Sequence, residues 1–393
     1  MRLSDFCGVR SGEKGFGAPG QEQGPGPAEP CEKKGRQDGS LAKVVVIDGF
    51  FLTEKVTGVQ RYALEMIRQI DRLWDPAEGE MEIAAPPGAV FPFPLEKIRL
   101  VTVGKRTGDA WVQIDLVRYL RKRKALVICM ENFLPIFYRK GLIMIHDISL
   151  KLNRRMFRES LRGRLSVRWR CLHYWLAAHS GMKIGTVSEN AKKEIVRAYG
   201  VRPERVTVIY SAWQHMDRVE PDESVLEGIS GEYYLALSSL APTKNFRWVV
   251  EAARNHPREQ FLIAGGGDVK QFLARHGAEG LKNLRLLGYV TDGQAKALMA
   301  HCKAFLFPTL YEGFGLPPLE AVAAGAEAVV LSDLPVLHEV YGEAGTYIDP
   351  RGDAAELPPL KKLSGEEKRA LLDRFSWERS AKIMLDTVLG RAG

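Results

Sequence analysis

Cysteine is scarce in this 393-residue sequence, and its five copies are odd in number, widely scattered and without a C-x-x-C pair. This argues against a disulfide framework and against a structural zinc site. No apolar run approaches the roughly 18 residues that cross a bilayer, since stretches such as ALVICM and AFLF stop well short. The first residues, MRLSDFCGVRSGEKG, lack the apolar core and cleavage site of a signal peptide. These absences predict a cytoplasmic protein.

The amino-terminal part differs in composition from the rest of the chain. Residues 1–40 are rich in glycine, proline and charge, with almost nothing to bury, which predicts a disordered tail. Beyond it, apolar runs such as KVVVID and YYLAL alternate with amphipathic segments such as YALEMIRQIDRLW and FRWVVEAARNH. The alternation occurs in two blocks, which predicts an α/β protein with two doubly wound parallel sheets.

A polar stretch separates the two blocks. Residues 216–232, MDRVEPDESVLEGISGE, contain little that a core could bury, as is typical of a domain boundary. We therefore expect one domain over residues 41–220 and a second over residues 221–375. The amphipathic segment 376–393 predicts a closing helix with Ser376 as its N-cap.

Residues 308–320, PTLYEGFGLPPLE, place two acids on either side of a turn. The layout predicts a strand, a loop and a helix opened by Pro317 and Pro318. The prolines remove two amide donors, so an anion bound here would depend on the main-chain amides between the acids, those of Gly313, Phe314, Gly315 and Leu316.

Glu312 and Glu320, the two acids, suit a ligand with hydroxyls at both ends and a diphosphate between them, because carboxylates accept hydrogen bonds from vicinal hydroxyls. A nucleotide sugar has this order of groups. On spacing alone a second interpretation stays open. In that case Glu320 would only interact favourably with the helix dipole in the first turn, and Glu312 would be a surface turn residue.

The stretch resembles the E-x7-E motif of retaining glycosyltransferases of family 4, the group that includes sucrose synthase-like and bacterial mannosyl- and glucosyltransferases. The similarity covers most of residues 43–390 and includes TGVQRYALEM, IHDISL, GTVSENAKKEI, LSSLAPTKNF and FSWERSA. It implies a GT-B fold, with two Rossmann-like domains facing across a cleft and a C-terminal helix crossing back to the first. The first domain would bind the acceptor and the second the nucleotide sugar.

The resemblance also implies roles for residues of the second domain. Glu312 would hold the transferred sugar and Glu320 the ribose, while Lys244 and the loop amides would meet the diphosphate. Ser239 and Gly265 are expected in the same binding site. Where family members commonly carry an arginine near the lysine, this chain has Ser238 and Thr243 instead. Either Lys244 suffices, Arg247 substitutes, or activity is weak.

In the first domain the resemblance points to three residues. Thr57 and Gly58 would approach the diphosphate from the opposite wall, and His146 would lie beside the reacting sugar as a third catalytic residue with Glu312 and Lys244. A plain turn at Thr57 and Gly58 and a structural strand-end histidine remain open alternatives. The other histidines have no paired ligands and are expected to be structural or exposed.

Basic residues are concentrated in two segments. Residues 151–170 hold eight basic side chains against one acid, and residues 118–124, RYLRKRK, add five more. The mixture of arginine with Leu161, Leu165, Val167 and Trp169 favours an interfacial helix on an anionic membrane surface. A solvated face is the other interpretation, and nucleic acid is not expected.

The resemblance therefore implies a retaining, metal-independent transferase of a mannose- or glucose-type hexose, with no cofactor and a GDP- or UDP-linked sugar as co-substrate. The acceptor would be a hydroxyl of a glycan or lipid-linked glycan, in cell-surface polysaccharide or glycolipid synthesis. We expect a cytoplasmic enzyme, or one docked on the inner face of the cell membrane. A non-catalytic sugar-binding derivative and a GT-B nucleotide-sugar 2-epimerase are the alternatives.

Overall fold

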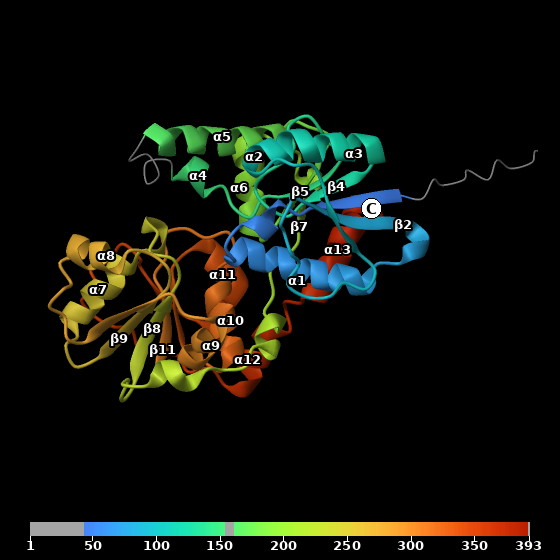
Figure 1. Ribbon diagram of the computed structural model, residues 1–393. Helices are drawn as coiled ribbons and strands as arrows, with labels where there is room; N and C mark the ends of the chain where they lie inside the picture. Colours follow the sequence, from blue (N-terminus) through green and yellow to red (C-terminus); the bar gives the residue numbers. More distant parts are fainter. Residues whose placement is uncertain (1–42, 154–160, 392–393) are drawn as a thin grey trace, which may run out of the picture. The chain divides into compact units, whose positions relative to one another are not determined.

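The computed structural model describes residues 43–153 and 161–391, although it gives no side-chain environment for residues 161–163. The tail predicted over residues 1–40 lies outside the described residues. The described chain forms two parallel β-sheets with helices packed on them (Figure 1). Both blocks of strand and helix alternation therefore give the predicted architecture.

The first sheet has seven strands in the order β3-β2-β1-β4-β5-β6-β7. Its strands are β1 Lys43–Asp48, β2 Gly79–Ala85, β3 Arg99–Thr102, β4 Leu126–Cys129, β5 Gly141–Met144, β6 Lys183–Thr186 and β7 Val206–Val208. Its helices are α1 Gly58–Leu73, α2 Gly108–Ala110, α3 Val117–Arg123, α4 Ser149–Leu152, α5 Leu161–Ala178 and α6 Glu189–Tyr199. A π-helical turn over Trp111–Leu116 joins α2 to α3. All pairings are parallel, as the β-branched, two-face-buried β1 predicts.

The second sheet has six strands in the order β10-β9-β8-β11-β12-β13. Its strands are β8 Tyr233–Leu237, β9 Gln260–Ala264, β10 Leu284–Gly288, β11 Ala304–Phe307, β12 Val329–Ser332 and β13 Thr346–Ile348. Its helices are α7 Phe246–Asn255, α8 Val269–His276, α9 Asp292–His301, α10 Leu316–Ala324, α11 Pro335–Tyr341 and α12 Gly365–Leu372. The strand order reverses between β8 and β11, and ligands of such sheets bind beyond the carboxyl ends of the strands at that point.

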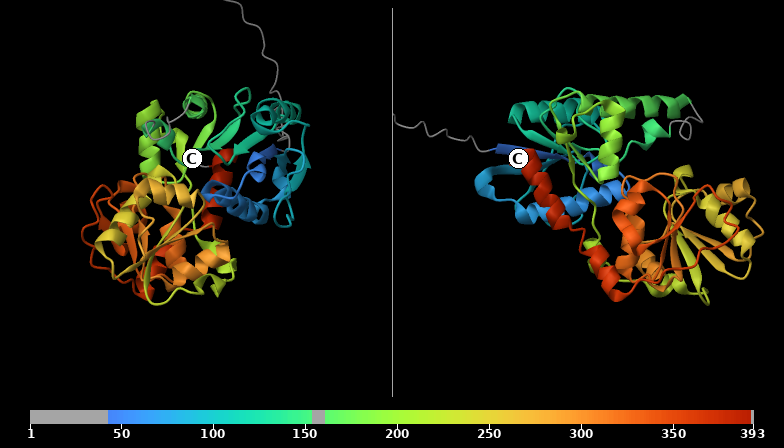
Figure 2. Two further views of the ribbon diagram at one scale, coloured as in Figure 1. Left: turned by 60° about the vertical axis from the view of Figure 1, so that its left-hand side comes forward. Right: turned by 180° about the vertical axis from the view of Figure 1, so that it is seen from behind.

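The last helix, α13 Trp377–Leu389, returns to the first sheet and packs along α1 (Figure 1, Figure 2). Ser376 is its N-cap and accepts a hydrogen bond from the Arg379 amide, as the sequence predicts. Trp377 is almost fully buried and its indole lies edge-on to Tyr62 of α1, with ring centroids 5.5 Å apart. The core of the first sheet is thus completed by residues from the far end of the described chain.

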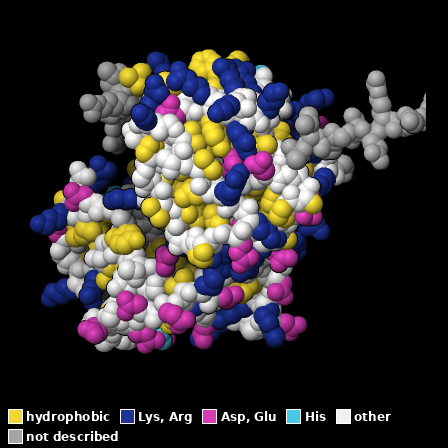
Figure 3. Space-filling view, turned by 45° about the vertical axis from the view of Figure 1, so that its right-hand side comes forward, with side chains coloured by type: hydrophobic (Ala, Val, Ile, Leu, Met, Phe, Trp, Pro, Cys, Tyr) yellow, Lys and Arg dark blue, Asp and Glu magenta, His cyan; other side chains and the backbone are white. Residues whose placement is uncertain are grey.

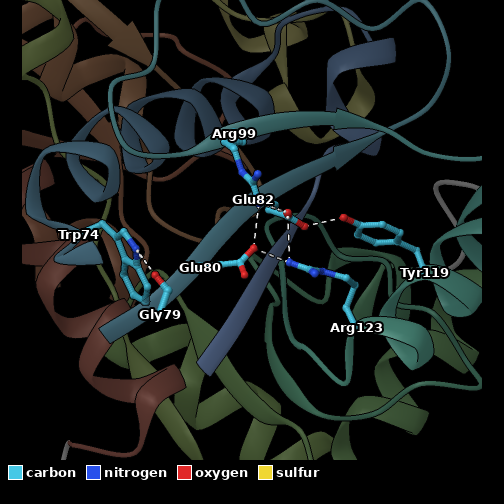
Figure 4. Close-up of polar contacts among 7 residues, drawn as sticks. All are labelled: Trp74, Gly79, Glu80, Glu82, Arg99, Tyr119 and Arg123. Atoms are coloured by element: carbon cyan, nitrogen blue, oxygen red, sulfur yellow. Dashed lines mark hydrogen bonds and ion pairs between the residues drawn. The ribbon is translucent and has the colours of Figure 1, made fainter. Parts of the chain in front are cut away.

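A charged network closes the edge of the first sheet (Figure 4). The buried Glu82 carboxylate accepts hydrogen bonds from Arg99 at 2.8 Å, from Arg123 at 3.3 Å and from the Tyr119 hydroxyl at 2.5 Å. Glu80 accepts from the same two guanidinium groups. Burial and the Glu82 carboxylate raise the pKa of Tyr119 to about 12. Tyr119 and Arg123 of the RYLRKRK run are therefore committed to the fold, because a buried carboxylate requires such partners.

Candidate active site

The loop between β11 and α10 carries the two acids singled out by the sequence. Pro317 and Pro318 lie in the first turn of α10, and the helix ends at Gly325, which has a positive φ of 118°. Gly315 also has a positive φ, of 89°, and a Cβ there would lie 2.6 Å from Leu337. The Tyr341 hydroxyl donates to the Gly315 carbonyl. The turn between the acids therefore depends on glycine and is held from α11.

Lys244 and Glu312, two residues of one predicted binding site, lie together. The Lys244 ammonium donates to Glu312 Oε1 at 2.7 Å, and the Thr309 hydroxyl donates to the same oxygen at 2.9 Å. The carboxylate side chain is 11% exposed and the lysine 23%. Because one carboxylate oxygen takes both bonds, Glu312 keeps its second oxygen, and Lys244 keeps two N–H groups, for a ligand.

Asn245 fixes the backbone beside Lys244. It adopts the left-handed conformation, with φ 54°, and its side-chain amide donates to the carbonyls of Pro308 at 2.9 Å and Pro350 at 2.7 Å. The Leu310 amide donates to the Thr243 carbonyl at 2.8 Å. The loop after β8 and the loop after β11 are thus tied together at the strand-order reversal.

Glu320 has a partner that the sequence analysis missed. Its Oε1 accepts a hydrogen bond from Nε2 of the buried His215 at 2.8 Å. His215 Nδ1 accepts from the Trp377 indole at 3.4 Å, so the imidazole is held between α13 and α10. From the sequence His215 is expected to be structural or exposed, and it is a structural residue that orients Glu320.

His146 contacts the loop between the two acids through its main-chain carbonyl. A Cβ on Gly313 would stand only 2.2 Å from the His146 carbonyl oxygen, so the two backbones are in close contact. The imidazole Nε2 donates to the Met130 carbonyl at 2.8 Å, and the ring lies edge-on to Tyr62 with centroids 4.8 Å apart. Burial lowers the pKa of His146, so its imidazole is neutral.

The other residues predicted from the sequence are more dispersed. Thr57 is the N-cap of α1, and its amide donates to Gln60 at 3.1 Å. Gly58 is exposed, and no protein atom lies within 4 Å of where its Cβ would be. Ser239 is exposed and lines a pocket between α7 and α8. Gly265 has a positive φ, and a Cβ there would overlap the Ser238 carbonyl, so chain packing by itself requires this glycine.

Two further contacts fix the loop against α6, and α11 contacts the same helix through Glu339. Ser188, the N-cap of α6, donates its hydroxyl to the Gly313 carbonyl at 2.7 Å. The Tyr311 hydroxyl donates to Glu194 at 2.6 Å. Glu339 of α11 accepts from the amides of Glu189 and Asn190 at 2.7 and 2.8 Å. The sequence marks Ser188 as a helix cap, but no local pattern identifies its partner.

Two carboxyl groups, the buried Asp48 and the half-buried Glu131, follow the carboxyl ends of β1 and β4. Burial raises the pKa of Asp48 and of Glu131 to about 7, and neighbouring acids contribute to the shift of Glu131. The Gln60 amide donates to Glu131 at 2.7 Å and to Glu54 at 2.9 Å. Within the described residues no cluster of His, Cys, Asp and Glu could hold a metal ion.

Comparison with known proteins identifies the part of the chain that holds the acids and the lysine. Residues 231–358 match the family model described as Glycosyl transferases group 1. We refer to residues 231–358, about a third of the chain, as the group 1 domain, after the family model that they match. This domain contains Lys244, Glu312 and Glu320, so the predicted resemblance to group 1 glycosyl transferases is confirmed for the part of the chain that carries them.

Two curated mannosyltransferases align with more than half of the chain. The O-antigen chain mannosyltransferase RfbU of Salmonella typhimurium is 27% identical over 263 residues, covering 64% of this chain and 68% of the relative. The O-antigen chain mannosyltransferase B of Escherichia coli is 32% identical over 225 residues, covering 51% of this chain and 58% of the relative. The chain thus spans only part of the length of each relative.

The fold agrees with solved glycosyltransferases. WaaG, a glycosyltransferase involved in lipopolysaccharide biosynthesis, superposes with a TM-score of 0.63 at 17% identity, covering 88% of this chain and all of WaaG. The likeness extends over both sheets, beyond the group 1 domain. The GT-B fold predicted from the sequence is therefore confirmed, including the helix α13 that returns to the first sheet.

Proposed function

We propose that this chain is a retaining, metal-independent glycosyltransferase that moves a hexose from a nucleoside-diphosphate sugar to a hydroxyl group. The observation that carries the proposal is the 2.7 Å contact between Lys244 and Glu312 within the group 1 domain. This contact places Lys244, a cation that can bind phosphate, beside Glu312, a carboxylate that can accept hydrogen bonds from sugar hydroxyls. Both lie beyond the carboxyl ends of parallel strands, where ligands of such sheets bind.

In this proposal each charged group has one task. Glu312 accepts hydrogen bonds from the hexose, and Glu320 accepts them from the ribose while His215 fixes its orientation. Lys244 and the amides of Gly313 to Leu316 hold the diphosphate. His146, whose imidazole is held by Met130, supplies the backbone wall behind Gly313.

The reaction needs no protein nucleophile. The bond between the anomeric carbon and the diphosphate oxygen breaks, and the acceptor oxygen bonds to the same face of that carbon. The acceptor's proton passes to the leaving diphosphate. Lys244 stabilises the negative charge that develops on the diphosphate, and such preorganised electrostatic stabilisation is often the largest single contribution to catalysis.

The names of the relatives favour mannose as the sugar, since both are O-antigen chain mannosyltransferases. We propose a GDP- or UDP-linked hexose as donor and a glycan or lipid-linked glycan of the cell surface as acceptor. A nucleotide-sugar 2-epimerase and a non-catalytic sugar-binding protein are the competing functions.

Thermal unfolding with nucleoside diphosphates tests this function. We expect GDP or UDP to raise the melting temperature, and the matching sugar donor to be consumed with release of that diphosphate. Accumulation of a 2-epimer would favour the epimerase, and stabilisation without turnover on any acceptor would favour the binding protein. If neither diphosphate changes the melting temperature, the assignment is wrong.

We also propose that α5 docks on an anionic membrane surface. Arg154, Arg155 and Arg158 of the predicted basic segment lie outside the described residues. In the described part of α5, Leu165, Trp175 and Leu172 are 56%, 50% and 39% exposed. With the exposed Arg168 they recur at helical spacing along one face. Lysine and arginine side chains gather along the upper edge of Figure 3, where α3 and α5 lie in Figure 1.

The apolar residues of the proposed docking surface differ from those predicted from the sequence. Val167 is buried, so the prediction that it inserts into lipid was wrong. Trp169 is half-buried: its indole N–H donates to Asp109 at 3.1 Å, and its ring lies against Phe133 and His173. Among the helices that the structure describes, none has the length and apolar content needed to cross a bilayer.

Vesicle sedimentation tests the docking surface. We expect the protein to pellet with vesicles containing phosphatidylglycerol and not with pure phosphatidylcholine. Arg168→Ala should weaken this binding by about fivefold, since one basic residue near such a surface contributes about 1 kcal/mol. Arg351→Ala, an exposed arginine of the other sheet, is the control. Equal binding to both lipids would exclude the surface.

A further inference from the structure

A pocket lies between α7 and α8, apart from the Lys244–Glu312 contact. It consists of two adjoining hollows of about 530 and 330 Å³ whose linings share Arg247, Arg275 and His276. The loops after β8 and β9 also line the larger hollow, through Ser239 and Gly266 among others. We name it the arginine pocket. Its position beyond the carboxyl ends of β8 and β9 is one where ligands of parallel sheets bind.

Positive charge in the arginine pocket is largely uncommitted. Arg275 is exposed and makes no hydrogen bond or ion pair with any residue that the structure describes. Arg247 donates only its Nε to Glu251, at 2.9 Å, which leaves its two terminal nitrogens. The remaining guanidinium, that of Arg254, donates to the Gly277 carbonyl at 2.9 Å. Arg247 and Arg275 are thus the two cations available to a ligand.

The acidic groups of the pocket are already engaged. Glu251 pairs with Arg247, and Asp268, the N-cap of α8, accepts from the Gln271 amide at 2.9 Å. Burial and the three neighbouring guanidinium groups lower the pKa of His276, so the imidazole is neutral and can donate a hydrogen bond without adding charge. These groups favour an anion with several acceptor oxygens.

The walls of the larger hollow are apolar. Leu240, Pro242, Phe272 and Leu310 line it together with the two arginines. Gly266 has no protein atom within 4 Å of where a Cβ would be, so the backbone is open to the hollow. A volume of about 530 Å³ exceeds what a lone phosphate fills and lies in the range of small-molecule sites.

We propose that the arginine pocket binds a phosphate monoester of a small carbon skeleton, such as a sugar phosphate. The phosphoryl group lies between Arg247 and Arg275, where guanidinium forks match its oxygens, and the carbon skeleton lies against Leu240, Pro242 and Phe272. The lining of this pocket contains none of Lys244, Glu312 and Glu320, although it includes Ser239, which the sequence places with them. Arg247 therefore serves the second ligand and does not replace the arginine missing beside Lys244.

Isothermal titration calorimetry on the full chain tests the proposal. The probes are mannose 6-phosphate, mannose and inorganic phosphate, each added with GDP and UDP present to occupy the proposed donor site. We expect mannose 6-phosphate to bind more tightly than either of the other probes. Arg275→Ala and Arg247→Ala should each raise its Kd by about tenfold or more, because each removes charge-assisted hydrogen bonds to phosphate.

Two variants separate this site from the donor site. Arg258→Ala removes an exposed arginine that lines neither hollow, and Lys244→Ala removes the proposed donor cation; both should leave the Kd unchanged. A Kd that rises in Lys244→Ala and not in Arg275→Ala would overturn the proposal. So would inorganic phosphate binding as tightly as the ester, which would reduce the pocket to an anion site. Arg275 is exposed, so its removal should not affect folding, which a melting curve checks.

Discussion

The Lys244→Ala variant is expected to lose about a hundredfold or more in kcat for sugar transfer while it stays folded. Lys244 is the cation placed on Glu312 at 2.7 Å, and the proposed mechanism uses it to stabilise charge on the departing diphosphate. Removing one preorganised donor of this kind costs on the order of 3 kcal/mol in the transition state. Stability should change little, because Thr309 still donates to the Glu312 carboxylate.

The measurement is steady-state transfer with the donor found by thermal unfolding, together with a melting curve for each variant. Lys282→Ala is the matched control, because Lys282 is an exposed lysine of the same domain outside the loops after β8 and β11. Wild-type turnover in Lys244→Ala would remove the lysine from the mechanism. A variant that fails to melt cooperatively would instead show that the ion pair is needed for folding.

Gly313→Ala should have an effect of similar size for a steric reason. The new Cβ would stand 2.2 Å from the His146 carbonyl oxygen, a backbone atom that cannot rotate away. The loop would have to move, which would break the Ser188 hydrogen bond to Gly313 and displace Glu312. We expect kcat/KM to fall by about a hundredfold, since small misplacements of positioning groups cost this much.

Gly280→Ala is the control for this substitution, because no atom lies within 4 Å of the added Cβ and the backbone needs no positive φ there. Both variants are compared by transfer rate and melting temperature. Gly313→Ala should also melt several degrees lower, as overpacked sites do. Normal activity and stability in Gly313→Ala would mean that the loop does not rest on His146 during turnover.

Much of the fold could be predicted from local patterns. Buried strands with β-branched runs, such as Lys43–Asp48, carry their own signal, and caps such as Ser188 and Ser376 mark where helices begin. The short edge strands β3 and β13 were not predicted. β3 has four residues and is mostly exposed, and β13 has three residues and is half-buried, so neither has the apolar run that marks a buried strand.

The partners of the site residues could not be predicted in the same way. His215 and Glu320 are 105 residues apart, and Glu339 meets the α6 amides 150 residues away. Such pairs form only when helices from the two sheets pack against each other. A local sequence pattern does not reveal that packing. Composition also could not predict the structural role of Arg123. In the sequence it belongs to a basic run, but in the structure its guanidinium pairs with Glu80 and Glu82 (Figure 4).

The return of α13 to the first sheet has a consequence for how this protein is made. Trp377, Met384 and Leu385 belong to the same buried cluster as Val45 and Ile67, which leave the ribosome far earlier. Until residues 377–389 have been translated, α1 presents an uncovered apolar face, and contacts this distant in sequence are slow to form. The first sheet therefore cannot complete its core until the second half of the chain has been synthesised. During that interval the apolar face of α1 is exposed and could be bound by a chaperone.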